Sequence, residues 1–253
     1  VGTILAERYG FRAPFFLFAL IAAVSFFLIF IIIPQPPIKR LEERLSVKTA
    51  LKNYWVLLQE AKVRSAAGAY ATMLFAVSTF VVFFPTWLEK EFQMTPSATA
   101  TLFMVGGIAN ILVGPQAGRW SDKIGRKPII IASCATSAVV FTAAPFIITG
   151  TLSAYAVFFL VMILLALRLS PLQALLTTLV PEHQRGSLMS LVVAVGQLGG
   201  GIGGIAAGVA YAQFGYMGNA FLSALFIGLT GLIVWCGLEE PSRLLLSERK
   251  RLS

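Results

Sequence analysis

Apolar residues in this chain fall into long runs separated by short polar segments. An α-helix needs about 20 apolar residues to cross the hydrocarbon core of a bilayer, and each run is close to that length or longer. The pattern therefore predicts an all-α membrane protein, a polytopic helical bundle of about seven transmembrane helices. The expected spans are 13–33, 66–88, 98–117, 128–149, 154–179, 188–212 and 220–238.

The polar segments divide the chain into four parts. We interpret residues 1–6 as the end of a helix that begins upstream, followed by a polar turn at 7–12 and the first full span. Pro34, Pro36 and Pro37 end that span, because proline removes a backbone donor and cannot continue a helix. Apolar residues recur every three or four positions in the charged segment 38–64, which predicts one or two amphipathic helices. The expected domains are 1–37, the linker 38–64, the six-helix unit 65–238 and the basic tail 239–253.

Composition identifies lipid as the solvent. The chain is 57% hydrophobic and 12% charged, with a net charge of +9 and a mean hydropathy of +0.83, whereas soluble domains carry about 25% charged residues. The basic residues lie between apolar runs and form no basic groove, so we expect no nucleic-acid partner. If segment 118–127 is cytoplasmic, sixteen of the twenty lysines and arginines lie on that side and three on the other. The positive-inside rule then predicts a multi-pass protein with its N-terminus outside and its C-terminus cytoplasmic.

Sequence motifs of enzymes and metal sites fail on their context. Residues 199–204 match G-x-G-x-x-G, but they lie inside an apolar run with no strand before them. His183 is the only histidine, and Cys134 and Cys236 lie in separate apolar runs. We therefore expect no catalytic residues, no metal and no cofactor.

One charged segment between two apolar runs carries the most specific pattern. It reads GRWSDKIGRK over residues 118–127, and its two glycines allow the tight turn that two adjoining spans need. The spacing G-x-x-x-D-K-x-G-R-K resembles the signature loop of the major facilitator superfamily, secondary transporters built from two six-helix halves. In that family the loop joins the second and third helices of a half, and its aspartate makes a contact in one access state only. The resemblance implies a conformational switch formed by Gly118, Asp122, Lys123, Gly125, Arg126 and Lys127.

Two other segments extend the resemblance. Residues 2–34 are similar to the connection between the fifth and sixth helices of a first half, and residues 181–186 to the loop between the tenth and eleventh helices. The latter implies a cytoplasmic charge network with Glu182 and Arg185, in which Glu182 would pair with Arg126 or Arg119. The resemblance thus covers the end of a first half, a central linker and a complete second half.

Glycines repeat every four residues on one face of the 188–212 run. Small residues at this spacing let two helix backbones approach closely in lipid. We interpret Gly196, Gly200, Gly204 and Gly208, with Gly199 and Gly203 beside them, as a packing face. The family position of this helix leaves a second interpretation open, a surface on which the two halves rock.

Arg168 is the one basic residue deep inside a span, about 15–20 Å from either end. A central arginine costs about 2.5–3.5 kcal/mol on insertion, so it needs a cavity or a partner. No acidic residue lies inside an apolar run, which leaves an anionic substrate, a carboxylate from the upstream half, or polar groups and water. A structural arginine held by carbonyls near Pro171 is the alternative. Asn110, Gln173 and Gln197 are further candidates for lining a cavity, or for helix-packing hydrogen bonds.

The function implied by the resemblance is secondary active transport of a small solute by alternating access, across the cell's inner (plasma) membrane. Short loops and the glycine-rich eleventh helix look most like the proton-coupled branch that exports drugs and metabolites. The implied partners are a small-molecule substrate, possible protons, the lipid bilayer and the missing N-terminal half. With no acidic residue in a run, a proton site lies upstream or coupling is absent. The alternative is a non-transporting membrane module that assembles with a partner or serves as a scaffold.

Overall fold

The computed structural model describes residues 9–32 and 54–240, and all regular elements in this part are helical. They are α2 (Ala13–Ile32), α4 (Ala61–Val82), α5 (Phe84–Phe92), α6 (Pro96–Ile124), α7 (Arg126–Ile147), α8 (Thr151–Leu176), the short 3-10 helix η1 (Glu182–Gln184) and α9 (Arg185–Gly237). Six stretches are long and apolar enough to cross a membrane, with α4 and α5 counted as one. The predicted all-α membrane architecture is confirmed. The predictions for residues 1–6, Pro34 to Pro37, the linker residues 38–53 and the tail from 241 lie outside the described residues.

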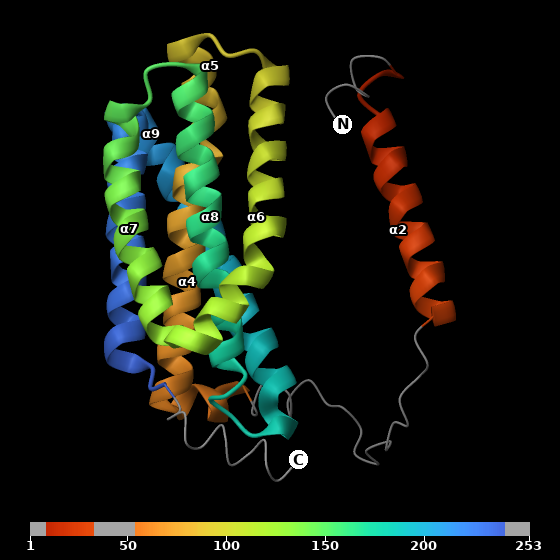
Figure 1. The fold of residues 1–253 in the computed structure, drawn as a ribbon, viewed down its shortest axis with the longest axis vertical. Helices are drawn as coiled ribbons and strands as arrows, with labels where there is room; N and C mark the ends of the chain where they lie inside the picture. Colours follow the sequence, from red (N-terminus) through yellow and green to blue (C-terminus); the bar gives the residue numbers. More distant parts are fainter. Residues whose placement is uncertain (1–8, 33–53, 241–253) are drawn as a thin grey trace.

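The 53-residue helix α9 contains a sharp turn that makes it two spans. Gly215 has φ 63° and ψ −160°, a left-handed conformation that glycine adopts without a steric penalty. Figure 1 shows the two parts of α9 running back along the same bundle. Counting them separately gives seven spans in the described part of the chain, as the apolar runs predicted.

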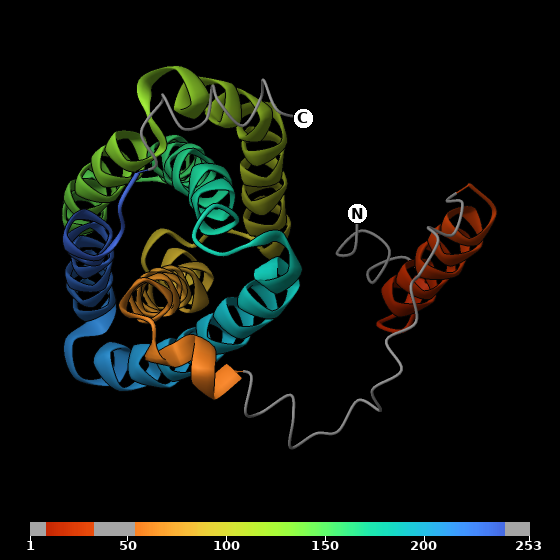
Figure 2. The ribbon, with the colours of Figure 1, turned by 90° about the horizontal axis from the view of Figure 1, so that it is seen from below.

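Helix α4 lies toward the middle of the bundle. Half of the most apolar stretch of α4 and α5 is buried, a larger share than in any other span of the described residues. Viewed end-on, both parts of α9 pack against α4, while α6, α7 and α8 form the opposite wall of the bundle (Figure 2). Rings from α4, α5, α7, α8 and α9 form stacked pairs, among them Phe80 and Phe141 with centroids 4.4 Å apart. Tyr216 begins the second part of α9 and donates its hydroxyl proton to the carbonyl of Phe80 at 3.0 Å.

Helix α2 lies beside this bundle and has no buried residue (Figures 1 and 2). Its 20 residues are all apolar except Ser25, so it is stable only with lipid or further protein around it. Gly10, with φ 85°, lies in the turn before it.

The charged segment 118–127 is almost entirely helical, and the expected loop is reduced to one residue. Helix α6 continues through Ile124, and α7 begins at Arg126. The helix can extend because the charged side chains of Arg119, Asp122 and Lys123 are exposed, whereas Ser121 on the opposite face is buried. Gly118 is helical and makes no turn. Gly125, with φ 119°, makes the turn alone, as only glycine does at low cost.

The linker also ends earlier than expected. Helix α4 begins at Ala61, so Lys62 and Arg64 belong to its first turn and not to the linker. Residues 54–59 form a helical turn before it, in which Leu57 is the buried residue and Trp55 is 68% exposed.

Candidate functional site

Arg126, the first residue of α7, joins the ends of four helices. Its Nη1 donates to the carbonyl of Ala174 near the end of α8 at 2.7 Å, and its Nη2 donates to Asp122 Oδ1 in the last turn of α6 at 3.3 Å. Its backbone N–H donates to Glu240 Oε1, just beyond α9, at 2.5 Å. Lys127 adds a contact from its Nζ to the carbonyl of Leu238 at 2.8 Å. We call these residues the Arg126 cluster: Asp122, Arg126, Lys127, Ala174, Leu238 and Glu240.

Glu240 caps the N-terminus of α7. A carboxylate stabilises a helix N-terminus because the first N–H groups have no partner inside the helix and carry partial positive charge. A Cβ on Gly125 would lie 3.1 Å from both carboxylate oxygens of Glu240 and would push this side chain away, and the φ of 119° already disfavours any other residue type. Beside this cap, Lys62 Nζ lies 3.0 Å from Glu239 Oε2. The hydrogen bond and charge of Lys62, with the charge of Lys127, lower the pKa of the Glu239 carboxyl below its usual 4.5.

Asp122 lies where a carboxylate is unfavourable for the helix itself. The C-terminus of a helix carries partial negative charge, so an acidic residue there costs about 0.3–1 kcal/mol. Arg126 offsets this cost with an i,i+4 ion pair, yet the Asp122 side chain is still 66% exposed. The carboxylate is thus oriented by Arg126 and open to a further partner.

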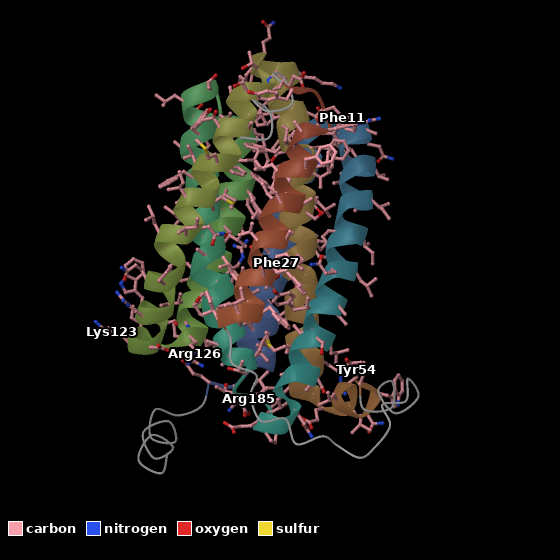
Figure 3. The ribbon with its side chains drawn as sticks, turned by 90° about the vertical axis from the view of Figure 1, so that its right-hand side faces the viewer. Phe11, Phe27, Tyr54, Lys123, Arg126 and Arg185 are labelled. Carbon is pink, nitrogen blue, oxygen red and sulfur yellow. The ribbon has the colours of Figure 1, made fainter. Side chains whose placement is uncertain are left out.

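Glu182 pairs with Arg185 and not with Arg126 or Arg119. The atoms Glu182 Oε1 and Arg185 Nη1 are 3.2 Å apart, across the 3-10 turn that precedes α9. Sequence spacing favours this pair, because i,i+3 residues share a helix face. Figure 3 shows Lys123, Arg126 and Arg185 at one end of the bundle, with Tyr54 beside them and Phe11 at the opposite end.

The glycine face of α9 packs on α4, with the closest approaches at Gly196, the first residue of the expected stripe, and at its two neighbours Gly199 and Gly203. A Cβ on Gly203 would lie 2.6 Å from the carbonyl oxygen of Phe75, and one on Gly199 would collide with the carbonyl oxygen of Ala71. Gly196 meets the ring of Tyr70. In contrast, Cβ atoms on Gly200, Gly204 and Gly208 would make ordinary contacts at 3.6–3.8 Å. We call Gly196, Gly199 and Gly203 the glycine seam.

Arg168 lies inside the bundle with 1% of its surface exposed. Its Nη1 donates to Ser137 Oγ on α7 at 2.7 Å, and its Nε and Nη2 are buried without a hydrogen-bond partner among the described residues. Ser133, one turn before Ser137, donates to the carbonyl of Leu164 at 2.6 Å. The guanidinium is therefore held by a serine of the next helix, and not by carbonyls near Pro171.

The other three candidates for a cavity lie away from Arg168. Gln173 and Gln197 are exposed and Asn110 is half-exposed, on α8, α9 and α6 respectively. None of them is hydrogen-bonded to Arg168 or to another of the three within the described ranges. The structure does not bring the four residues together into one site.

Sequence reasoning missed Glu239, Glu240 and Ser137. Two adjacent acids directly after the last span, at the end of the bundle that holds the basic segment, were a usable signal for the first two. Ser137 carries no such signal, because it is 31 residues from Arg168 and is one of several small polar residues on α7.

Two comparisons with known proteins bear on this arrangement. Residues 66–252 match the Major Facilitator Superfamily. The chain is also 26% identical over 231 residues to the uncharacterized MFS-type transporter YceJ of Bacillus subtilis (strain 168). That alignment covers 90% of this chain and 57% of the relative, so the chain spans little more than half of the protein it matches.

Proposed function

Because this chain belongs to the major facilitator superfamily, we propose that the protein is a secondary transporter that moves a small solute across the plasma membrane by alternating access. Residues 1–37 would be the end of its first half, 38–60 the connection and 61–238 the second half, with a tail at 239–253. An upstream segment would supply the remainder of the first half. Proton-coupled export of drugs or metabolites is the specific activity that we propose.

The observation that carries this proposal is the exposed Asp122 carboxylate held in place by Arg126. Transporters that alternate need contacts that form in one state and break in the other. Asp122 lies at a helix C-terminus, where its charge is unfavourable, and 66% of its side chain is exposed. A helix N-terminus from the other half is a suitable partner, because the interaction is worth up to about 2 kcal/mol when partly buried and can be reversed.

The Arg126 cluster supports the proposal because its contacts stay within one half. Hydrogen bonds from charged donors contribute about 1.5–3 kcal/mol each, so the bond from Arg126 to Ala174 holds α7 firmly to α8. The ends of the four helices would then move as a unit when the two halves rock. Asp122 moves with them, so its contact reports the position of the whole half.

Substitutions in this segment test the proposal in cells that express the protein with its upstream half. Asp122→Ala and Arg126→Gln should raise the accumulation of labelled benzoate toward the level of cells without the transporter, while the amount of inserted protein stays nearly unchanged. Arg119→Gln is the matched control. It removes one positive charge from the same segment, but Arg119 is exposed and has no hydrogen bond or ion pair within 54–240, so export should persist.

A second assay tests alternating access without knowledge of the substrate. A cysteine at the exposed Gln197 should react with an impermeant thiol reagent from either side of the membrane, in right-side-out and in inverted vesicles. A cysteine at Val139, which is 68% exposed on α7, should react from neither side because lipid covers it. A Gln197 cysteine that never reacts from one side would favour the alternative function, a membrane module that does not transport.

A further inference from the structure

Arg168 has two N–H donors without a hydrogen-bond partner, and it lies in the buried interior, where an unpaired donor is destabilising. Its side chain is 1% exposed, and it lies about 12 Å along α8 from the end of the helix at Leu176. Nη1 is satisfied by Ser137, but Nε and Nη2 have no partner among the described residues. A buried donor left unpaired costs about 1–3 kcal/mol, and more when it is charged.

The two unused nitrogens form one edge of the guanidinium. Nε–H and one N–H of Nη2 point in parallel from this edge, which is the geometry that receives the two oxygens of a carboxylate. Ser137 occupies the opposite side, through Nη1, and fixes the orientation of the plane. A water molecule can also accept hydrogen bonds from this edge, but a carboxylate offers one oxygen to each donor and also neutralises the charge.

The surroundings do not supply that carboxylate. In the described part of the chain, the acidic residues lie at the ends of the spans: Glu60, Glu89, Glu91, Asp122, Glu182, Glu239 and Glu240. The residues near Arg168 on α7 are Ser133, Cys134 and Ser137, all buried on one face. This face is polar but uncharged, so the charge of Arg168 is not balanced by its neighbours.

We propose that the Nε/Nη2 edge of Arg168 binds a carboxylate in a bidentate manner, at a site between α7 and α8 that Ser137 orients. This rests on the proposed transport function and deepens it, because a carboxylate-bearing solute is then the substrate class that the second half recognises. The same chemistry can come from an acidic side chain of the upstream half. Because Arg168 is enclosed, either carboxylate reaches it when α7 and α8 part around Ser137, while the helix ends that Arg126 joins stay together.

Cys134 gives a native reporter for the site. It lies three residues before Ser137 on the same buried face, while Cys236 is exposed and can be replaced by serine. In the protein with its upstream half and Cys236→Ser, the rate at which N-ethylmaleimide modifies Cys134 is measured by peptide mass spectrometry. Benzoate should slow that reaction several-fold, whereas benzamide with an equal concentration of sodium chloride should not.

Variants of Arg168 distinguish the effect of bidentate hydrogen bonding from the effect of the positive charge. Arg168→Lys keeps the positive charge but has no bidentate edge, so protection by benzoate should weaken at least about tenfold. Arg168→Gln should abolish it. Ser137→Ala removes only the partner of Nη1 and should retain part of the protection. Arg12→Lys is the matched control at an exposed arginine and should behave as wild type.

The second arm identifies an internal source. If an acidic side chain of the upstream half occupies the edge, benzoate will not protect Cys134. One carboxyl of that half should then resist carbodiimide-coupled reaction with glycine ethyl ester in the wild type and react in both Arg168 variants. Protection that survives in the Arg168 variants, or the lack of both benzoate protection and a newly reactive carboxyl, would overturn the inference. Neither result depends on the two-sided labelling of Gln197, so the transport proposal stands or falls separately.

Discussion

Alanine substitutions in the glycine seam should destabilise the protein, whereas the same substitution at the next residue, Gly200 or Gly204, should be tolerated. Gly203→Ala places a methyl group 2.6 Å from the carbonyl oxygen of Phe75 and 2.9 Å from its Cα. Both atoms are backbone, so no change of rotamer relieves the clash. Helices α4 and α9 must separate by about 0.8 Å before the methyl reaches an ordinary contact of 3.4 Å. Overpacking of this kind costs about 1–3 kcal/mol.

The next residue is the matched control. Gly204→Ala brings the methyl within 3.6 Å of the Ser78 hydroxyl, which is an ordinary contact. Both substitutions replace glycine by alanine inside one helix, so both gain about 1 kcal/mol of helix propensity. That gain cancels in the comparison, and the difference in unfolding free energy between the two variants should be about 1–3 kcal/mol. Gly199→Ala against Gly200→Ala should repeat the result, because Gly199 faces the carbonyl of Ala71.

The assay is thermal unfolding of the purified protein, with its upstream half, in detergent. We expect Gly203→Ala to unfold at a lower temperature than Gly204→Ala, with Gly204→Ala equal to or above wild type. Equal unfolding temperatures for the two variants would refute the close approach of α9 to α4. A larger drop in unfolding temperature for Gly204→Ala would show that α4 contacts the four-residue stripe that contains Gly204, as the sequence suggested. Reduced transport with unchanged stability in Gly204→Ala would point to a rocking surface at that position.

Two further predictions concern orientation and pH. Single cysteines at Ser121 and Gln213 should react with an impermeant thiol reagent from opposite sides of the membrane, and reaction of both from one side would contradict the proposed topology. Glu239 has a lowered pKa, so its pair with Lys62 contributes fully above the usual value of 4.5 and is lost as the pH falls through the lowered one. The difference in unfolding temperature between wild type and Glu239→Gln should therefore hold from neutral pH to about 4.5, shrink as the pH falls further and vanish below the lowered pKa. A difference that changes near neutral pH would exclude Glu239 as its source.

The positions of the spans could be predicted from the sequence because hydrophobicity alone determines them. In lipid every backbone group must be paired within its own segment, so an apolar run of sufficient length has no alternative to a helix. The break between the last two spans was also predictable, since polar and glycine residues interrupt the run around Gly215. The ends of helices were less so. Helix α6 extends beyond the apolar run to Ile124, because a helix can continue outside the bilayer where its charged side chains reach water.

The sequence could not predict which residues of two neighbouring helices are in contact. Positions 196 to 208 of α9 are rich in small residues on more than one face, and the rotation of the helix about its axis decides which of them meet α4. For Arg168, the pattern indicated that a partner was needed but not which one. Ser137 is a hydroxyl on another helix, and its role follows only from the packing of α7 against α8. Glu240 acts through the backbone N–H of Arg126, a group that no side-chain motif records.

The two ends of the bundle are held together in different ways, and this difference restricts where a state-dependent contact can lie. At the end opposite the Arg126 cluster, Phe80, Phe84 and Tyr216 are buried and stacked, and each large side chain contributes about 1.5–3 kcal/mol through burial. Those contacts are lost only by unfolding the half. At the other end the bonds of Arg126 are polar but also internal to the half. When the helix ends of this half stay together, its contact with the other half is made by groups on its surface, and Asp122 is the acidic group of the Arg126 cluster that such a contact can still use.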